Sequence, residues 1–408
     1  MPSINNAQPA HRAIPSVPVL SLASFRQEHA THLPSLLDGA DVRLVTSGRV
    51  AIGLALRAMG VGKGDVVMVP AYHSPSMIPP VHWCGAEVVF YRVQADTSVD
   101  LADLRAKFEP NVKAVMATHF FGIPQDLAPL RALCDERGAG LLEDCAHCFF
   151  GERGGVQVGS TGDYAIGSSM KFFPIYEGGC LVSHRHRIGA VLQGAGAGFE
   201  AKAALAALEA SFAYGRLHGA RWLLALPLRA RSAVWDALKA RQSGGGHGGA
   251  SMVAASLAPS SSDSSFTFDP RWADKRSSWF SRILLRRVAA SRIVTRRRRH
   301  YQMLQHGLDG APGWRPLFAA LPDGACPWVF PLMSEHPMAL AAALQAAGVP
   351  MVRFGATLWP GVDEHVCANS MLLGRQLIAL PCHQELRGQE LAWLVATVRK
   401  SLFDTAAA

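Results

Sequence analysis

The 408-residue sequence contains no apolar run long enough to cross a membrane, because runs such as Val66–Ala71 and Trp222–Leu228 fall far short of about 18 residues. Its amino terminus also lacks the basic start and long apolar stretch of a secretory signal. Only 17% of residues are charged while 49% are hydrophobic, which excludes an intrinsically disordered chain. The eight cysteines are scattered, which indicates free thiols rather than a disulfide framework. We therefore expect a large globular protein of the cytoplasm.

Acidic residues are the minority charge, with 31 Asp+Glu against 40 Lys+Arg and a formal net charge of +9. A positive balance suits an anionic partner, which could be nucleic acid, a membrane surface or a phosphorylated small molecule. The densest basic run is Arg296–Arg299, with Arg286, Arg287 and Arg292 upstream. That run indicates either contact with such a partner or a solvated helix face.

Between residues 44 and 183, short apolar β-rich runs alternate with helical patterns. This alternation predicts an α/β domain with a mostly parallel sheet, whose catalytic groups gather at strand ends and in the loops that follow. The predicted strands are Val66–Pro70, Glu87–Val93, Lys113–Thr118, Gly140–Asp144, Asp163–Ser168 and Gly179–Ser183, and the predicted helices are Arg49–Met59, Leu101–Phe108 and Asp126–Arg137.

The pattern changes after this region. Residues 200–240 are rich in Ala, Leu and Arg and indicate helix, whereas residues 242–266 are rich in Gly and Ser and indicate a loop or linker. A basic helical stretch then runs through Tyr301. The remainder predicts a smaller α/β domain with strands near Pro327–Met333 and Pro350–Phe354 and a closing helix over Gln389–Phe403. We divide the chain into an amino-terminal extension (1–26), a large domain (27–266) and a connecting helix with a small domain (267–408).

The segment Ser47-Gly48-Arg49 directly precedes an apolar-periodic helix. Free backbone N–H groups and the helix dipole at such a start can bind a phosphate. A serine and a glycine before a helix are, on their own, more often a cap. The segment becomes informative only together with the motifs below.

Two ionisable residues stand at the ends of predicted strands. Asp144 follows a buried apolar run, and a buried carboxylate is costly unless it is paired. A protonated ring nitrogen of a cofactor would serve as its partner; the alternative is a cap on the next helix. Lys171 follows hydroxyl residues and precedes a glycine-rich turn, and burial there would lower its pKa and favour a Schiff base. A lysine without such neighbours is usually a solvated surface group.

These motifs together resemble the DegT/DnrJ/StrS family of sugar aminotransferases, which depend on pyridoxal phosphate (PLP) and have the fold type I architecture. The family implies a large α/β/α domain with a mostly parallel sheet and a smaller carboxyl-terminal α/β domain. The most specific part of the match is the spacing from Lys171 to Glu177-Gly178-Gly179. The matching segments run in family order: Ser47-Gly48, Gly64–Pro70, His119–Asp126, Glu143–His147, Gly159–Asp163, Lys171 with its glycine-rich turn, and Leu380–His383.

The resemblance assigns roles to single residues. Lys171 would bond to PLP and later move the proton between cofactor and substrate carbons, and Asp144 would keep the pyridinium nitrogen protonated, which makes the ring an electron sink. His147 stands where the family has Gln or His beside the phenolic oxygen of PLP. These three residues form the expected reaction centre.

The resemblance also implies a phosphate site and a stacking residue. The phosphate would be held by Ser168, or alternatively Ser169, together with the backbone at Ser47, Gly48 and Arg49. The lysine lies closer to these serines than is usual in the family, which leaves the choice between them open. The aromatic ring that stacks on the cofactor would be Tyr72 or His73, each of which could instead be a core residue.

The activity that the resemblance implies is transfer of an amino group from an amino acid donor, glutamate first, to a keto-sugar nucleotide, for polysaccharide or glycoconjugate synthesis. It also implies a homodimer, with Arg276 as the candidate for a residue that reaches a neighbouring active site. A related PLP-dependent sugar dehydratase is disfavoured by Lys171, since those enzymes carry histidine there. A non-catalytic regulator or scaffold that kept the fold is a further alternative.

Two other patterns predict nothing catalytic. Cys145 and Cys148 form a single C-x-x-C with no second pair, so we expect no metal site. Gly194–Gly198 lacks the spacing and the preceding strand of a dinucleotide loop, which disfavours a nicotinamide-linked oxidoreductase. We expect no nucleic-acid partner and no membrane span.

Overall fold

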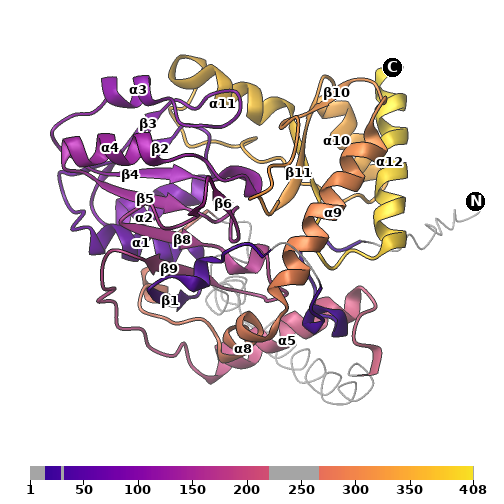
Figure 1. Cartoon of the computed structure of the whole chain (residues 1–408), viewed down its shortest axis with the longest axis horizontal. Helices are drawn as coiled ribbons and strands as arrows, with labels where there is room; N and C mark the ends of the chain where they lie inside the picture. The colour runs from indigo at the N-terminus through magenta and orange to yellow at the C-terminus, as the bar shows by residue number, and fades with distance from the viewer. Residues whose placement is uncertain (1–13, 29–31, 220–265, 408) are drawn as a thin grey trace, which may run out of the picture.

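A seven-stranded sheet forms the core of the larger part of the computed structural model, which describes residues 14–28, 32–219 and 266–407 (Figure 1). The strand order is β1-β9-β8-β5-β4-β2-β3. The pairs β2–β3, β2–β4, β4–β5 and β5–β8 are parallel, whereas β9 runs antiparallel to both β8 and β1. The strands are β1 (Asp41–Val45), β2 (Val66–Pro70), β3 (Glu87–Tyr91), β4 (Val112–Thr118), β5 (Gly140–Asp144), β8 (Tyr164–Gly167) and β9 (Gly179–Ser183). The predicted mostly parallel α/β fold is confirmed.

Helices cover both faces of this sheet. Because side chains alternate along a strand, Val67 and Val69 of β2 face α1 (Gly48–Ala58) and α2 (Ile78–Trp83), while Val66 and Met68 face the opposite layer. That opposite layer contains α3 (Leu101–Ala106), α4 (Ala128–Arg137) and α11 (Glu364–Gln376). The whole of β2 is therefore buried, as expected for a central parallel strand.

A smaller antiparallel sheet follows toward the carboxyl terminus, in the order β10-β11-β12. Its helices share one apolar core with β11 and β12, and α12 lies at the outer edge of the molecule (Figure 1). The elements are α9 (Ala290–Leu308), β10 (Trp314–Pro316), β11 (Val329–Ser334), α10 (Pro337–Ala346), β12 (Leu377–Pro381) and α12 (Gly388–Ala406). The expected strand over Pro350–Phe354 is wrong, because only Val352 bridges to Ala379 there.

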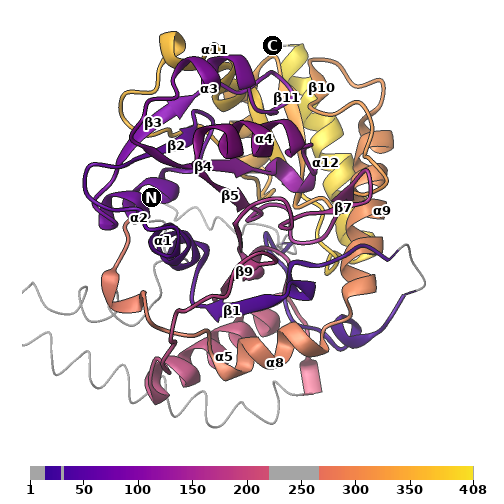
Figure 2. The same cartoon turned by 60° about the vertical axis from the view of Figure 1, so that its left-hand side comes forward.

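The connecting segments lie against both sheets. Helices α5 (Ala197–Ala213) and α8 (Trp279–Arg287) lie side by side near β1 (Figure 2). Ser21 and Ser24, in the described part of the amino-terminal extension, donate hydrogen bonds to the carboxylate of Glu385. A short hairpin, β6 (Glu152–Arg153) with β7 (Val156–Gln157), completes the strands of the described ranges. Within these ranges no helix has the length and apolarity to cross a bilayer.

Several predictions fall outside the described residues. The predicted helix over 200–240 is observed only in α5, since residues 220–265 are not described. The Gly/Ser-rich stretch 242–266 lies outside the description except for Phe266. The domain boundary after residue 266 stays a prediction; downstream of it, Arg276 still bridges to Val45 of β1.

Candidate active site

The site forms where neighbouring parallel strands end. β4, β5 and β8 are adjacent and parallel, so Thr118, Asp144 and Ser168 emerge at the same edge of the sheet. Open α/β sheets bind ligands at this edge. The short 3-10 helix η5 (Ser169–Lys171) follows β8 directly and brings Lys171 to the same place.

Asp144 is a buried carboxylate with neutral hydrogen-bond donors. It accepts hydrogen bonds from the Thr118 hydroxyl at 3.2 Å and the Ala146 N–H at 2.9 Å. It forms no ion pair with any residue in the described ranges. Burial raises its pKa above the ordinary value, which the Ala146 N–H and the nearby charge of Lys171 partly offset. A cation brought to this carboxylate would find a strong partner.

Lys171 carries the complementary group. Burial lowers the pKa of its amine to about 8, although the charge of Asp144 acts in the opposite direction. Its Nζ lies 4.6 Å from the centroid of the Trp328 ring. The amine is therefore far closer to its neutral, nucleophilic form at neutral pH than a surface lysine.

His147 lies among aromatic rings beside Lys171. Its ring stacks on Trp328 at 4.0 Å between centroids and meets Phe354 edge-on at 4.8 Å. Burial, with the charge of Lys171 as a second cause, holds its pKa well below the ordinary value, so the imidazole is neutral. Its buried Nδ1 has no hydrogen-bond partner among the described residues. A ligand atom placed there would satisfy a polar group that is otherwise costly to bury.

The amino end of α1 closes another side of the site. Ser47 caps the helix through its hydroxyl, which accepts from the Val50 N–H. A methyl group on Gly48 would contact the Cβ of Ser168 at 3.8 Å, and one on Gly179 would lie 2.6 Å from the Gly48 nitrogen. The helix start, Ser168 and the glycine-rich turn are therefore adjacent.

The other two predicted phosphate residues lie in different surroundings. The guanidinium of Arg49 is buried and donates to the Thr267 carbonyl at 2.6 Å. The hydroxyl of Ser169 is buried without a partner in the described structure, and a methyl group added at Gly178 would lie 4.0 Å from it. Ser168 faces the helix start and Ser169 faces the turn, so both border the expected phosphate site.

Neither expected stacking residue touches Lys171 or His147 in any described ring contact. Tyr72 is fully buried, donates from its hydroxyl to the Phe354 carbonyl and packs against Phe120. His73 stacks on Phe90 and accepts from the Trp359 N–H. The Lys171 amine instead contacts the ring of Trp328, which no sequence motif marks.

The remaining acidic and sulfur groups near Asp144 have structural partners. Glu143 accepts from the N–H groups of Gly159, Thr161 and Gly162 and pairs with His119, which fixes the turn before β8. Together with Cys145, His119 and Glu143 are close enough for a metal, but these hydrogen bonds already occupy the carboxylate. Burial raises the pKa of the Cys145 thiol well above its ordinary value, which disfavours the thiolate a metal needs.

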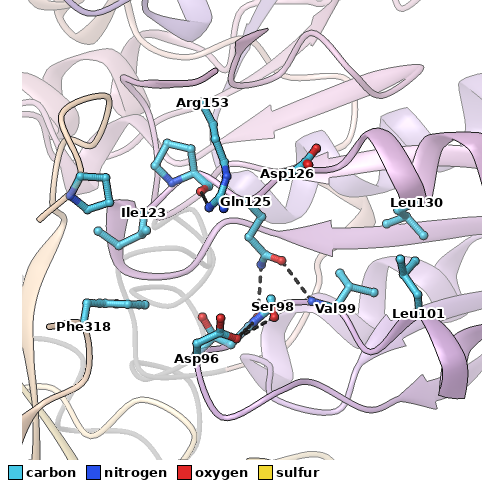
Figure 3. A pocket seen from close by; sticks show the side chains of 13 residues that line it. Asp96, Ser98, Val99, Leu101, Ile123, Gln125, Asp126, Leu130, Arg153 and Phe318 are labelled. Atoms are coloured by element: carbon cyan, nitrogen blue, oxygen red, sulfur yellow. Dashed lines mark hydrogen bonds between the residues drawn. The ribbon is translucent and has the colours of Figure 1, made fainter. Parts of the chain in front are cut away.

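A separate pocket of about 340 Å³ is lined by the loops that carry Ser98 and Gln125 and by Phe318 (Figure 3). Phe318 lines it and contacts Phe121, which in turn stacks against His147. Gln125 links its own loop to the loop of Thr97 and Val99: it accepts a hydrogen bond from the Val99 N–H and donates one to the Thr97 carbonyl (Figure 3). Lys171, Asp144 and His147 are not among the residues that line this pocket.

A known family model matches the part of the chain that contains this site. Residues 20–192 match the DegT/DnrJ/EryC1/StrS aminotransferase family, and this range contains the strand-end residues described above. The matched range is about two fifths of the chain, and over that range the chain is similar to the DegT/DnrJ/EryC1/StrS family.

Curated relatives match over part of their length. The GDP-perosamine synthase of Vibrio cholerae is 34% identical over 169 residues, which cover 41% of this chain and 46% of the relative. A UDP-N-acetyl-3-dehydro-alpha-D-glucosamine 3-aminotransferase of Acidithiobacillus ferrooxidans is 31% identical over 40% of this chain and 50% of its own. The chain thus matches about half the length of these curated relatives.

Solved structures of similar fold cover far more of the chain. The PLP form of Spr1654 from Streptococcus pneumoniae has a TM-score of 0.64 and 17% identity, covering 96% of this chain and 99% of that one. The aminotransferase TlmJ from Streptoalloteichus hindustanus has a TM-score of 0.59 and 21% identity, and the match covers 90% of this chain and 87% of TlmJ. At these identities the likeness shows the DegT-type fold and no more.

Proposed function

We propose that this protein is a PLP-dependent aminotransferase that moves an amino group from an amino acid donor to a keto-sugar nucleotide. The observation that carries the proposal is the pair formed by Lys171 and Asp144. A lysine with a lowered pKa and a buried carboxylate without a cationic partner meet at one strand edge. A surface lysine and a helix cap would show neither property.

The residues present fit PLP. Asp144 lacks a cation that a pyridinium nitrogen would supply, and His147 Nδ1 lacks a partner that a phenolic oxygen would supply. Ser168, the unpartnered hydroxyl of Ser169 and the amino end of α1 offer donors for a phosphate. When bound, PLP supplies an electron sink for the electrons released at the substrate carbon.

The chain's own residues have distinct tasks in this proposal. Asp144 holds a proton on the ring nitrogen by keeping its negative charge beside it. Lys171 Nζ attaches the cofactor and, once released, carries a proton between carbon atoms. Neutral His147 can donate or accept a single hydrogen bond without adding charge to the site.

The substrate class rests on the relatives. The names of two of them specify a GDP-linked or UDP-linked sugar, and another is an L-glutamine:2-deoxy-scyllo-inosose aminotransferase. We propose a keto-sugar nucleotide as acceptor and glutamate as first donor to test, with glutamine as the comparison. The excess positive charge of +9 is compatible with a diphosphate substrate. A homodimer, with Arg276 reaching the neighbouring site, is part of the same proposal.

The experiment is covalent trapping of the cofactor. Borohydride added to the PLP-loaded protein should fix PLP to Lys171, which peptide mass spectrometry locates. Lys171→Ala should abolish trapping, and Lys113→Ala, at an exposed strand position, should leave it unchanged. Wild-type protein that is not labelled would contradict the proposal and favour a non-catalytic scaffold.

A second assay separates transfer from the related dehydration. Glutamate or glutamine is mixed with the PLP-loaded protein, and loss of the cofactor's visible absorption band reports amine transfer. A keto-sugar nucleotide should then restore the band as it collects the amine. If PLP is trapped on Lys171 but neither glutamate nor glutamine transfers its amine, the aminotransferase assignment is contradicted. The protein would then be a PLP-dependent enzyme of another kind.

A further inference from the structure

Arg297 of α9 is a fully buried guanidinium next to the proposed site, with a relative exposure of 0%. Burying a cation is costly unless its hydrogen-bonding groups are satisfied. Arg297 forms no ion pair within the described ranges. Its Cζ instead lies 4.5 Å from the centroid of the Phe172 ring, and its N–H groups are bound by neutral oxygens. A buried charge kept without a carboxylate needs an explanation beyond stability.

The carbonyls that Arg297 binds belong to two segments of the site. Its Nη2 donates to the Lys171 carbonyl at 2.7 Å. Its Nη1 donates to the carbonyls of Pro327 at 3.1 Å and Trp328 at 2.9 Å. One guanidinium thus connects the backbone that carries the Lys171 amine to the backbone that carries the indole beneath it.

Neighbouring groups hold this arrangement in place. Gln384 accepts from Arg297 Nε at 2.9 Å and donates to the Phe172 carbonyl at 2.7 Å. The backbone N–H of Trp328 donates to the Phe121 carbonyl at 2.9 Å. The planar fork of an arginine can span several carbonyls at once, whereas a lysine ammonium cannot present the same planar set of donors.

We propose that Arg297 is a positioning residue that fixes the Lys171 amine over the Trp328 ring by binding the backbone carbonyls of both residues. Among the described residues, the hydrogen bonds of Arg297 go to main-chain oxygens and to Gln384, so we infer that it acts through Lys171 and not on substrate. The inference rests on the proposed function, because it concerns the reactivity of Lys171 toward PLP. It also assigns a use to one member of the arginine run that the sequence marks as basic.

The test is a double-mutant cycle on cofactor binding. Arg297→Gln should slow covalent attachment of PLP, followed by absorbance and borohydride trapping, by at least about tenfold. In the Lys171→Ala background, where PLP binds only non-covalently, the same change should alter the PLP dissociation constant by less than about twofold. A general loss of structure would weaken PLP binding in both backgrounds.

Matched variants complete the experiment. Arg296→Gln, one residue earlier, removes an arginine that pairs with Glu28 and should leave the attachment rate unchanged. Arg297→Lys should recover part of the rate. If Arg297→Gln does not fold, Gln384→Met loosens the same guanidinium and should slow attachment in the same selective way.

The outcomes distinguish the two proposals. Attachment as fast in Arg297→Gln as in wild type, or an equal loss in both backgrounds, overturns the positioning role alone. A wild-type protein that PLP does not label overturns the proposed function and, with it, this inference.

Discussion

At the scale of single residues, the site combines two ionisable groups whose surroundings favour their neutral forms. Burial raises the pKa of Asp144 and lowers that of Lys171. Each partly stabilises the charged form of the other, but desolvation dominates in both. This balance leaves a nucleophilic amine available and a carboxylate that gains from a bound cation.

The first prediction concerns Asp144→Asn. The amide keeps the size of the side chain but removes the negative charge that would hold a pyridinium proton. We expect the rate of amine transfer from glutamate to fall by at least about 100-fold, since charge stabilisation of this kind is worth that much. PLP labelling of Lys171 should persist. Stopped-flow absorbance gives the rate, and a variant that transfers the amine nearly as fast as wild type would show that Asp144 has another role.

The second prediction is the pH dependence of cofactor attachment. The Lys171 amine must be neutral to attack, and its pKa of about 8 means that it is mostly protonated below that pH. The attachment rate should therefore rise about tenfold per pH unit below about 8 and level off above it. For a lysine in a short peptide, whose pKa is about 10.4, the rate of reaction with PLP should continue to rise above about pH 8. If the attachment rate of the protein has the same pH dependence as that of the peptide, the lowered pKa of Lys171 is contradicted.

The sequence motifs point to residues at the ends of β4, β5 and β8. These strands lie side by side in the sheet in the same order as in the chain, so the motifs that follow them also lie side by side. Asp144 ends β5, Lys171 follows β8, and these two strands pair directly, so local patterns place both residues at one edge of the sheet. Trp328 and Arg297 could not be predicted in the same way. They come from distant segments that meet the site only through tertiary packing, and no local spacing encodes that contact.

At the scale of elements, the junction of β9 and α1 sets the geometry of the proposed phosphate site. Gly179 begins β9 and passes so close to the start of α1 that a Cβ would overlap the Ser47 carbonyl carbon and lie 2.6 Å from the Gly48 nitrogen. Both atoms that define the clash belong to backbone, so neither can rotate away. The glycine is required for this approach.

The third prediction follows from that contact. Gly179→Ala should lower the free energy of unfolding by about 1–3 kcal/mol, because the added methyl group displaces the start of α1. The affinity for PLP should fall with it. Gly62→Ala is the control, since a methyl group there has no neighbour within 4 Å. Urea unfolding and PLP titration give the two values, and equal effects in both variants would show that the close approach does not matter.

Elements that are buried on both faces were predicted best. β2, β5 and β9 have the predicted bounds, because continuous apolar runs between turns leave little choice of register. β1 was missed: its sequence Asp-Val-Arg-Leu-Val is half-buried and lies at the edge of the sheet, so it gives no apolar run. The segment Pro350–Phe354 was predicted as a strand because it is apolar. Its apolar residues instead pack against the core from a loop.

At the scale of the whole molecule, much of the concentrated positive charge is used internally. Arg292 and Arg296 both pair with Glu28, and Arg298 donates to carbonyls of Pro322, Asp323 and Ala325. For these three arginines, internal partners replace the alternative of a purely solvated helix face. These arginines fix α9 between the amino-terminal segment and the small sheet, where Arg297 can reach the site.

The two sheets meet at the proposed cofactor site, because Trp328 directly precedes β11 while Asp144 ends β5 and Lys171 follows β8. Gly122 permits this meeting: its φ is +92°, and a methyl group there would lie 2.7 Å from the Trp328 nitrogen. A ligand bound between these segments must restrain both sheets. PLP at about 100 times its dissociation constant should add about 2.7 kcal/mol to the unfolding free energy.

The fourth prediction is where that stabilisation occurs. Hydrogen exchange followed by mass spectrometry should show slower exchange on PLP addition in peptides containing the end of β5 and η5, and also in the peptide that joins Trp328 to β11. Arg297→Gln should keep the protection at β5 and lose it at β11, because the guanidinium carries the link between the two segments. Protection limited to the seven-stranded sheet in the wild-type protein would show that the small sheet takes no part in holding the cofactor.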